Sequence, residues 1–222
     1  LADGDGRVRA AAEPALVKVA CKGDPCVIEE VGALLAHPDP SVGEAAVAVL
    51  GRLAGRGDAR ALSCAVGCLK HVSAHVRVAG VMALGRLAKE GDKQTMGLVI
   101  AQLRDDDAKV RKVAVNALAE CVAPGDARAV SAIKGRLKDD SAPVRVVAMA
   151  AVVEVSSVGD RSAIAAVARH LDDANEAVRR GAKQALWKAL QRAAETADAR
   201  SVTTLGSCLE DADADVRRAA AG

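Results

Sequence analysis

DAKVRKVAVNALAECVAPGDARAVSAIKGRLKDD, the stretch from Asp107 to Asp140, holds the pattern that decides the fold. Its Val-Arg pair recurs along the chain at a step of 34 residues five times and then of 38, with Val42-Gly43 in one of the places. A fixed period in this range is typical of a solenoid, in which each repeat packs only against its neighbours. The pair stands at Val8-Arg9, Val76-Arg77, Val110-Arg111, Val144-Arg145, Val178-Arg179 and Val216-Arg217.

Each repeat is predicted to form two helices joined by a tight turn. The residue three before each Val-Arg position is Asp, Ser or Asn, and such side chains cap helix N-termini by accepting from free backbone N–H groups. A Gly-Asp pair, Gly125-Asp126 in the quoted stretch, predicts a left-handed glycine that ends the first helix and an aspartate that caps the second. The first-helix caps are Asp5, Asp39, Ser73, Asp107, Ser141, Asn175 and Asp213, and a leucine follows eleven residues after each second-helix cap, at Leu35, Leu69, Leu103, Leu137, Leu171 and Leu209.

We therefore expect an all-α fold: a right-handed alpha-alpha superhelix, which is a solenoid of antiparallel helix pairs in one continuous domain over residues 1–222. The sixth repeat has four added residues around Gln191 to Glu195, about one helical turn, so one helix should be longer there. Both ends lack polar capping repeats, so we expect the array to continue beyond this chain. The expected repeats are 5–38, 39–72, 73–106, 107–140, 141–174 and 175–212, with a partial repeat 213–222.

The composition supports a helical interior of small side chains. Hydrophobic residues make up 51% of the chain and charged residues 27%, and there is no Phe, no Tyr and one Trp. The net charge of +2, with both signs interspersed, excludes a strong field that would attract nucleic acid or an anionic membrane. No apolar run approaches the roughly 18 residues that a bilayer span needs. Most of the six cysteines fall where other repeats carry Ala, Leu, Ser or Gly, so we expect a soluble, intracellular protein in a reducing compartment.

The Asp-x-x-Val-Arg opening, the Ala-x-x-Ala-Leu centre and the Gly-Asp turn resemble HEAT repeats, in particular the short variety of phycobilisome-lyase-like proteins. The resemblance covers the whole chain and implies an armadillo-type superhelix that serves as a scaffold. Tetratricopeptide repeats share the period, but their aromatic positions have no counterparts here. HEAT-fold deoxyhypusine hydroxylase holds iron with His-Glu pairs, and no histidine precedes a glutamate at His37, His71, His75 or His170.

The recurring arginine predicts a structural ladder. An arginine in the first turn of a helix faces the positive end of the helix dipole, so it requires a carboxylate nearby. Aspartates of the turns between repeats are the expected partners, and phosphate binding by the column is the alternative. The ladder arginines are Arg9, Arg77, Arg111, Arg145, Arg179 and Arg217.

A basic column lies twelve residues past the caps of three second helices, at Lys70, Arg104 and Lys138. Together with Lys134, Arg136 and Arg169 it predicts a patch on the inner face that binds an acidic helix or extended peptide. The alternative is that the dipole alone favours cations in the last turn of a helix. Nucleic acid is not expected, because the patch has no aromatic side chain to stack a base. Trp187 stands in a column of mostly small residues, either as a contact anchor or as a space filler.

Two cysteine groups are predicted to be incidental. Cys64, Cys68, His71 and His75 would span about 16 Å on one helix, too far for ligands that share one zinc ion. Cys21 and Cys26 flank a Gly-Asp turn without redox spacing, so we expect two thiols. The chain is therefore expected to be a non-enzymatic protein-interaction scaffold without a cofactor. A subunit of a bilin-lyase-like, chromophore-attaching complex and a structural spacer in a large assembly are the alternatives.

Overall fold

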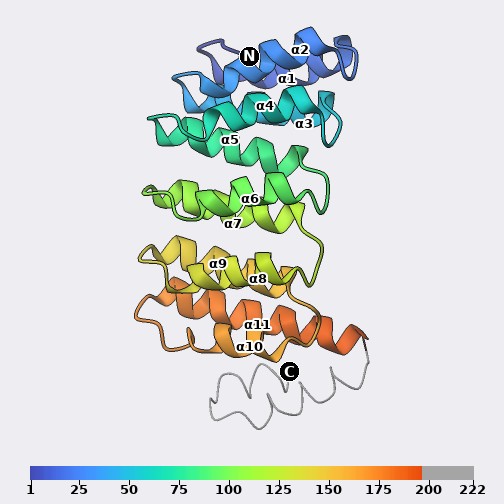
Figure 1. Cartoon of the computed structure of the whole chain (residues 1–222). Helices are drawn as coiled ribbons and strands as arrows, with labels where there is room; N and C mark the ends of the chain where they lie inside the picture. Colours follow the sequence, from blue (N-terminus) through green and yellow to red (C-terminus); the bar gives the residue numbers. More distant parts are fainter. Residues whose placement is uncertain (197–222) are drawn as a thin grey trace. The chain divides into compact units, whose positions relative to one another are not determined.

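The computed structural model describes residues 1–196, which form helices joined by short turns and contain no strand (Figure 1). The predicted all-α fold is therefore confirmed. The chain divides into two compact units, 1–121 and 122–222, each described here by itself. The predictions for Asp213, Leu209 and Arg217 lie outside the described residues.

The elements are α1 (Gly6–Val19), α2 (Pro25–Ala33), the short 3-10 helix η1 (Leu34–Ala36), α3 (Pro40–Leu53), α4 (Ala59–Cys68), α5 (Ala74–Leu87), α6 (Lys93–Gln102), α7 (Ala108–Cys121), α8 (Ala127–Lys134), the 3-10 helix η2 (Gly135–Lys138), α9 (Ala142–Val155), α10 (Arg161–Ala168) and α11 (Glu176–Thr196).

The first unit consists of two layers of helices. In the layer of first helices, α1 packs on α3, α3 on α5 and α5 on α7. The second helices α2, α4 and α6 pack on this layer, and each contacts the first helix of the following repeat. The turns within repeats lie at one end of the helix pairs and the turns between repeats at the other (Figure 1).

The second unit repeats this arrangement. There α9 packs on α11, while α8 packs on α9 and α10 contacts both α9 and α11. Helix α11 has 21 residues, against 14 in α9, because it continues through the four added residues without a break. The expected longer helix of the sixth repeat is thus present.

The Gly-Asp turns have the predicted backbone and one feature that was not predicted. The glycine of each turn has a positive φ, between 72° at Gly159 and 89° at Gly125, and the aspartate accepts backbone N–H groups of the second helix. The glycine N–H also donates to the last first-helix carbonyl of the following repeat, 30 residues along the chain. These bonds join Gly23 to Leu53 (2.9 Å), Gly57 to Leu87 (2.6 Å), Gly91 to Cys121 (3.4 Å) and Gly125 to Val155 (2.6 Å).

The first-helix caps follow the prediction except at the two serines. Asp and Asn caps accept from the first turn, as Asp39 does from the Ser41 N–H at 2.9 Å. Ser73 and Ser141 occupy the cap position without such a hydrogen bond. The Ser73 hydroxyl lies 2.7 Å from His75 Nδ1 instead, so these repeats begin their first helix without a side-chain cap.

Small residues allow the helices to approach closely. A β-carbon at Gly80 in α5 would lie 2.7 Å from Cys68 Cβ and 2.8 Å from the Ala65 carbonyl oxygen in α4. At Gly85 it would lie 2.9 Å from the α-carbon of Ala117 in α7. Contacts this short do not occur between real side chains, so both interfaces depend on the absence of a side chain. The predicted leucines seal the second helices and are all buried: Leu35, Leu69, Leu103, Leu137 and Leu171.

Candidate functional site

The ladder arginine of the third repeat is fully engaged within the first unit. Arg77 donates from Nε and Nη2 to the two carboxylate oxygens of Asp105, at 2.7 and 2.8 Å. Its Nη1 donates to the carbonyl oxygens of His71 and Val72, at 2.9 and 3.1 Å. Four hydrogen bonds thus use four of the five N–H groups of this guanidinium, so Arg77 has little capacity left for a ligand.

The second unit contains the same arrangement at Arg145. This guanidinium contacts both carboxylate oxygens of Asp173, at 3.1 and 2.9 Å, and donates to the carbonyl oxygens of Asp139 and Asp140. Both side chains of the ion pair are largely buried, with 16% of Arg145 and 13% of Asp173 exposed. Together with the bonds to Asp139 and Asp140, this two-pronged, partly buried pair joins the turn before α9 to the turn before α11.

The acceptor of the ladder has a second bond inside its own turn. Asp105 accepts from the Asp107 backbone N–H at 2.9 Å. Burial raises the pKa of the Asp105 carboxyl, but the hydrogen bonds from Arg77 and Asp107 outweigh burial, so this pKa lies below its usual value. The pKa of Asp173 is lowered for the same reasons, against burial, by Arg145 and the Asn175 N–H.

Two histidines replace the acceptor aspartate where the ladder is weak. His37 and His71 accept the backbone N–H of Asp39 and Ser73 through Nδ1, at 3.0 and 3.1 Å. His71 lies 28 residues after Gly43, which lacks a guanidinium, just as Asp105 lies 28 residues after Arg77. The imidazole of His71 therefore preserves the turn where no arginine needs a carboxylate. His37 lies 28 residues after Arg9, which lies 3.8 Å from Asp39 instead.

The other ladder arginines within residues 1–196 donate to carbonyls of the turn that precedes their own first helix. Arg111 donates to the carbonyl oxygens of Asp105 and Asp106, both at 3.0 Å. Arg179 donates to those of Asp173 and Ala174, and Arg9 donates to that of Asp3. Arg9 also lies 3.8 Å from a carboxylate oxygen of Asp39.

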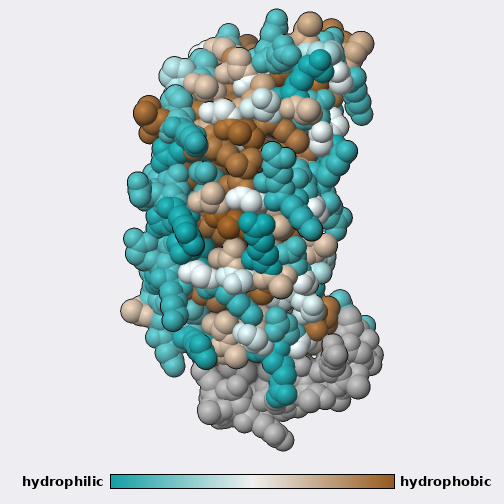
Figure 2. Space-filling view, in the orientation of Figure 1, coloured by the Kyte–Doolittle hydropathy of each residue, from teal (hydrophilic) through white to brown (hydrophobic). Residues whose placement is uncertain are grey.

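Two members of the predicted basic patch, Lys70 and Arg104, lie in the first unit. Both are exposed and follow the ends of α4 and α6, and their side chains have no hydrogen-bond or ion-pair partner within residues 1–196. Ser63 of α4 is exposed, and Val66, one turn later, is 39% exposed. Figure 2 shows apolar side chains that reach the surface between polar ones around α4 and α5. Cations and apolar surface therefore occur together on this helix layer.

The other four basic residues lie in the second unit and are not equivalent. Lys134 lies 3.8 Å from Asp160 and 3.1 Å from the Ser162 hydroxyl, and Arg136 lies 3.3 Å from Asp139. Lys138 and Arg169 are exposed and have no partner among the described residues. The predicted patch is thus divided between the units, and two of its members are used internally.

Trp187 belongs to a different helix layer from the basic patch. It lies on α11, a first helix, with 40% of its surface exposed. The neighbouring Lys188 forms an ion pair with Glu154 of α9, at 2.6 Å. Trp187 is therefore a separate apolar feature of the first-helix layer.

The first-helix layer of the first unit contains a hollow that was not predicted. It has a volume of about 500 Å³ and is lined by Ala48, Gly51, Arg52, Ala54, Arg56, Arg86 and Glu120. A smaller hollow of about 110 Å³ shares Arg86 and Glu120 with it and extends along α5 and α7. We call this surface, defined by Gly51, Arg52, Arg56, Arg86 and Glu120, the arginine furrow. Its sequence signal is a glycine before a charged residue near the end of the first helix, at Gly51-Arg52 and Gly85-Arg86.

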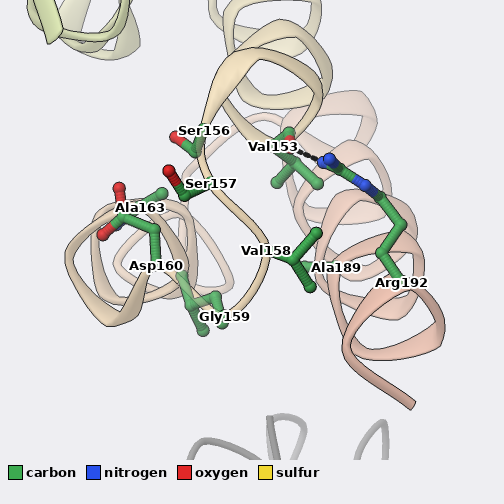
Figure 3. Close-up of a pocket in the computed structure, with 10 residues that line it drawn as sticks. Val153, Ser156, Ser157, Val158, Gly159, Asp160, Ala163, Ala189 and Arg192 are labelled. Carbon is green, nitrogen blue, oxygen red and sulfur yellow. Dashed lines mark hydrogen bonds between the residues drawn. The ribbon is translucent and has the colours of Figure 1, made fainter. Parts of the chain in front are cut away.

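A hollow in the second unit is too small for an organic ligand (Figure 3). It has a volume of about 10 Å³ and lies beside the turn from Ser156 to Asp160, with Ala189 and Arg192 of α11 on its other side. Arg192 reaches across and donates to the carbonyl oxygen of Val153. The buried Ser156 hydroxyl has no hydrogen-bond partner among the described residues. A space of this size admits at most one water molecule.

The described residues form no group of three or more His, Cys, Asp or Glu side chains that could hold a metal ion. Cys68 donates to the Cys64 carbonyl at 3.4 Å, and His75 Nε2 lies 3.3 Å from the His37 carbonyl oxygen. Cys21 and Cys26 are exposed thiols. None of the helices within residues 1–196 combines the length and the apolar character needed to cross a membrane.

Solved structures of repeat proteins share this fold. The X-ray structure of YibA from E. coli aligns with a TM-score of 0.63 and 19% identity, covering 99% of this chain and 75% of YibA. The S. pombe condensin Cnd3–Cnd2 subcomplex aligns with a TM-score of 0.61 and 15% identity, covering 95% of this chain and 31% of that chain. A designed armadillo repeat protein in complex with the peptide (KR)4 aligns with a TM-score of 0.50 and 21% identity, over 87% and 96% of the two chains.

A search of curated proteins finds no match. The family model described as HEAT repeats matches residues 66–151 and 97–187, which together span 66–187. This match is to HEAT repeats in general, so the phycobilisome-lyase-like subclass stays a prediction. Since the matched span is 122 of the 222 residues, more than half, the chain belongs to the HEAT-repeat family.

Proposed function

We propose that this HEAT-repeat protein is a non-enzymatic scaffold that binds an acidic segment of a partner protein along the second helices of its first unit. Repeat arrays of this kind present extended surfaces that are typical of protein-interaction scaffolds. The observation that carries the proposal is the pair Lys70 and Arg104. They are exposed cations at equivalent positions of successive repeats and have no partner in the described chain.

The surface beside these cations fits a peptide. The exposed side chain at Ser63 is small, and Gly97 has none, so a partner backbone can approach α4 and α6 closely. Val66 adds apolar surface between these positions and Lys70. The designed armadillo repeat protein with (KR)4 supports this mode, because there a repeat protein holds a charged peptide. Here the exposed side chains are basic, so the complementary peptide is acidic.

The spacing of the repeats suggests how the acidic groups are arranged. The first helices α3, α5 and α7 pack in succession, so one repeat advances by about the 8–10 Å that separates packed helices. We expect the equivalent residues Lys70 and Arg104 to be separated by at least about this distance. On a partner helix, two carboxylates seven residues apart are separated by about 10 Å. On an extended peptide, a separation of three residues gives about the same distance. Lys138 and Arg169 provide the same chemistry in the second unit.

Site-specific photocrosslinking tests this proposal. A photoreactive amino acid at Ser63 should crosslink to a partner segment that mass spectrometry identifies as rich in Asp and Glu. The double change Lys70→Glu and Arg104→Glu should reduce the crosslink at least tenfold, because it reverses both charges that face the carboxylates. The matched control, Lys109→Glu and Lys112→Glu, changes the charge of the same unit equally, on the exposed part of α7. It should leave the crosslink within twofold.

Three results would contradict the proposal. The crosslinked segment could lack acidic residues, or both double variants could lose the crosslink equally. The crosslink could also persist in the Lys70 and Arg104 double variant. A structural spacer without a binding surface would give no position-specific crosslink at Ser63.

A further inference from the structure

We propose that the arginine furrow is a second binding surface, which holds a phosphorylated serine or threonine of an extended partner peptide. Unlike Lys70 and Arg104, it lies in the layer of first helices, so it is independent of the function proposed above. Its guanidinium groups contrast with those of the ladder. Arg52, Arg56 and Arg86 are exposed, and their guanidinium groups have neither a hydrogen bond nor an ion pair with any residue of 1–196.

The backbone brings the three arginines to one place. Arg52 lies in the last turn of α3, and Arg56 follows four residues later in the Gly-Asp turn. That turn is attached to α5 by the hydrogen bond from the Gly57 N–H to the Leu87 carbonyl, at 2.6 Å. Arg86 reaches back from α5, and its Cδ lies 3.6 Å from the point where a β-carbon of Gly51 would be. Arg86 therefore lies directly against α3 beside Arg52.

Three guanidinium groups around one hollow indicate a phosphoryl group. A phosphorylated side chain carries close to two negative charges at neutral pH and three acceptor oxygens. The planar fork of arginine matches these oxygens in pairs. A single carboxylate carries one charge and two oxygens, so it would leave part of this donor set unused. The hollow of about 500 Å³ is large enough for a phosphorylated side chain and its flanking backbone.

The furrow also has a negative end. Glu120 of α7 occupies the place equivalent to Arg86, and its Oε2 lies 3.3 Å from the point where a β-carbon of Gly85 would be. Glu120 is exposed and has no partner among the described residues. A basic residue of the peptide would pair with it. Since one repeat advances the surface by about 8–10 Å, the basic residue is expected three positions from the phosphorylated one in an extended peptide.

Fluorescence anisotropy with peptide libraries tests this inference on the full chain. One library has a fixed phosphoserine between degenerate positions, and the second has serine at the same place. We expect saturable binding of the phosphoserine library only, with enrichment of Lys or Arg three positions from the phosphoserine. The change Glu120→Gln should abolish this enrichment, because it removes the carboxylate that selects the basic residue.

Charge-neutralising variants separate the furrow from general attraction. The pair Arg52→Gln and Arg56→Gln should raise the dissociation constant of the phosphoserine library at least tenfold. The matched pair Lys109→Gln and Lys112→Gln removes the same charge from the same unit and should change it less than twofold. The double variant Lys70→Glu and Arg104→Glu should also leave the dissociation constant of the phosphoserine library unchanged. This inference and the proposed function can therefore fail separately. The inference would be overturned if both libraries bound equally or if neither showed saturable binding. It would also be overturned if the arginine pair and the matched lysine pair lost the same affinity for the phosphoserine library.

Discussion

Replacement of Gly80 by alanine is the sharpest test of the close helix packing in the first unit. The new β-carbon would lie 2.7 Å from Cys68 Cβ and 2.8 Å from the Ala65 carbonyl oxygen. Ordinary contact begins at 3.4 Å, so α4 and α5 would have to separate by about 0.6–0.7 Å, the difference between 3.4 Å and these two distances. The carbonyl oxygen belongs to the backbone and cannot rotate away. Gly80→Ala therefore forces the two helices apart.

The expected magnitude follows from two opposing terms. Overpacking of a close interface costs about 1–3 kcal/mol, and the change from glycine to alanine inside a helix returns about 0.5–1 kcal/mol. We expect a net loss of about 1–2 kcal/mol in the free energy of unfolding. Gly85→Ala should have the same sign, because its β-carbon would lie 2.9 Å from the Ala117 α-carbon.

Urea denaturation followed by far-UV circular dichroism measures this effect. Gly67→Ala is the matched control, since it also lies in a helix of the first unit and its β-carbon would have no atom within 4 Å. We expect this control to be stabilised by about 0.5–1 kcal/mol. The reasoning is refuted if Gly80→Ala unfolds at the same or a higher urea concentration than the unchanged protein while Gly67→Ala behaves as expected.

Three further predictions concern the ladder and the thiols. Arg145→Met should lower the free energy of unfolding by about 2–3 kcal/mol, because it leaves the Asp173 carboxylate without its guanidinium partner in a largely buried place; a loss below about 0.5 kcal/mol in urea denaturation would contradict this. The pKa values of Asp105 and Asp173 are lowered in the folded protein, so the unfolded chain binds more protons in acid. The free energy of unfolding should therefore be constant above roughly pH 5 and fall as the pH drops through about 4 and below. The urea midpoint of Arg145→Met should fall less steeply with decreasing pH than that of the unchanged protein, and identical slopes would contradict the assignment. Burial raises the pKa of the Cys121 thiol to about 11. Iodoacetamide at about pH 8 should therefore label the exposed Cys21 of the native protein and leave Cys121 unlabelled, as peptide mass mapping would detect. Equal labelling of both thiols would show that α7 is not packed as described.

Most of the fold was predictable because its signals are local and repeat. The caps, the Gly-Asp turns and the apolar stripes depend on residues within one helix or turn, so the sequence states each of them several times. The serine caps were the exception. Ser73 has a hydroxyl that can cap, but His75 lies within its reach and takes that hydroxyl instead. A cap residue type therefore shows where a helix begins but not which hydrogen bond it makes.

The candidate site was less predictable because it depends on side chains from different repeats. Lys134 and Lys70 cannot be ranked from sequence alone: Lys134 is engaged by Asp160 and Ser162, whereas Lys70 has no partner in the described chain. The arginine furrow was missed for a related reason. Its hollow is lined by residues of two first helices and a turn, and part of its charge comes from Arg86 of the next first helix.

The glycine N–H bonds of the Gly-Asp turns have a consequence for how such a chain can change its length. Each bond runs from one turn to the end of the next first helix, at a constant separation of 30 residues, and reaches no further. A gene duplication that inserts one whole 34-residue unit therefore supplies a new donor for the preceding repeat and a new acceptor for itself. Duplication of complete repeats therefore preserves these hydrogen bonds.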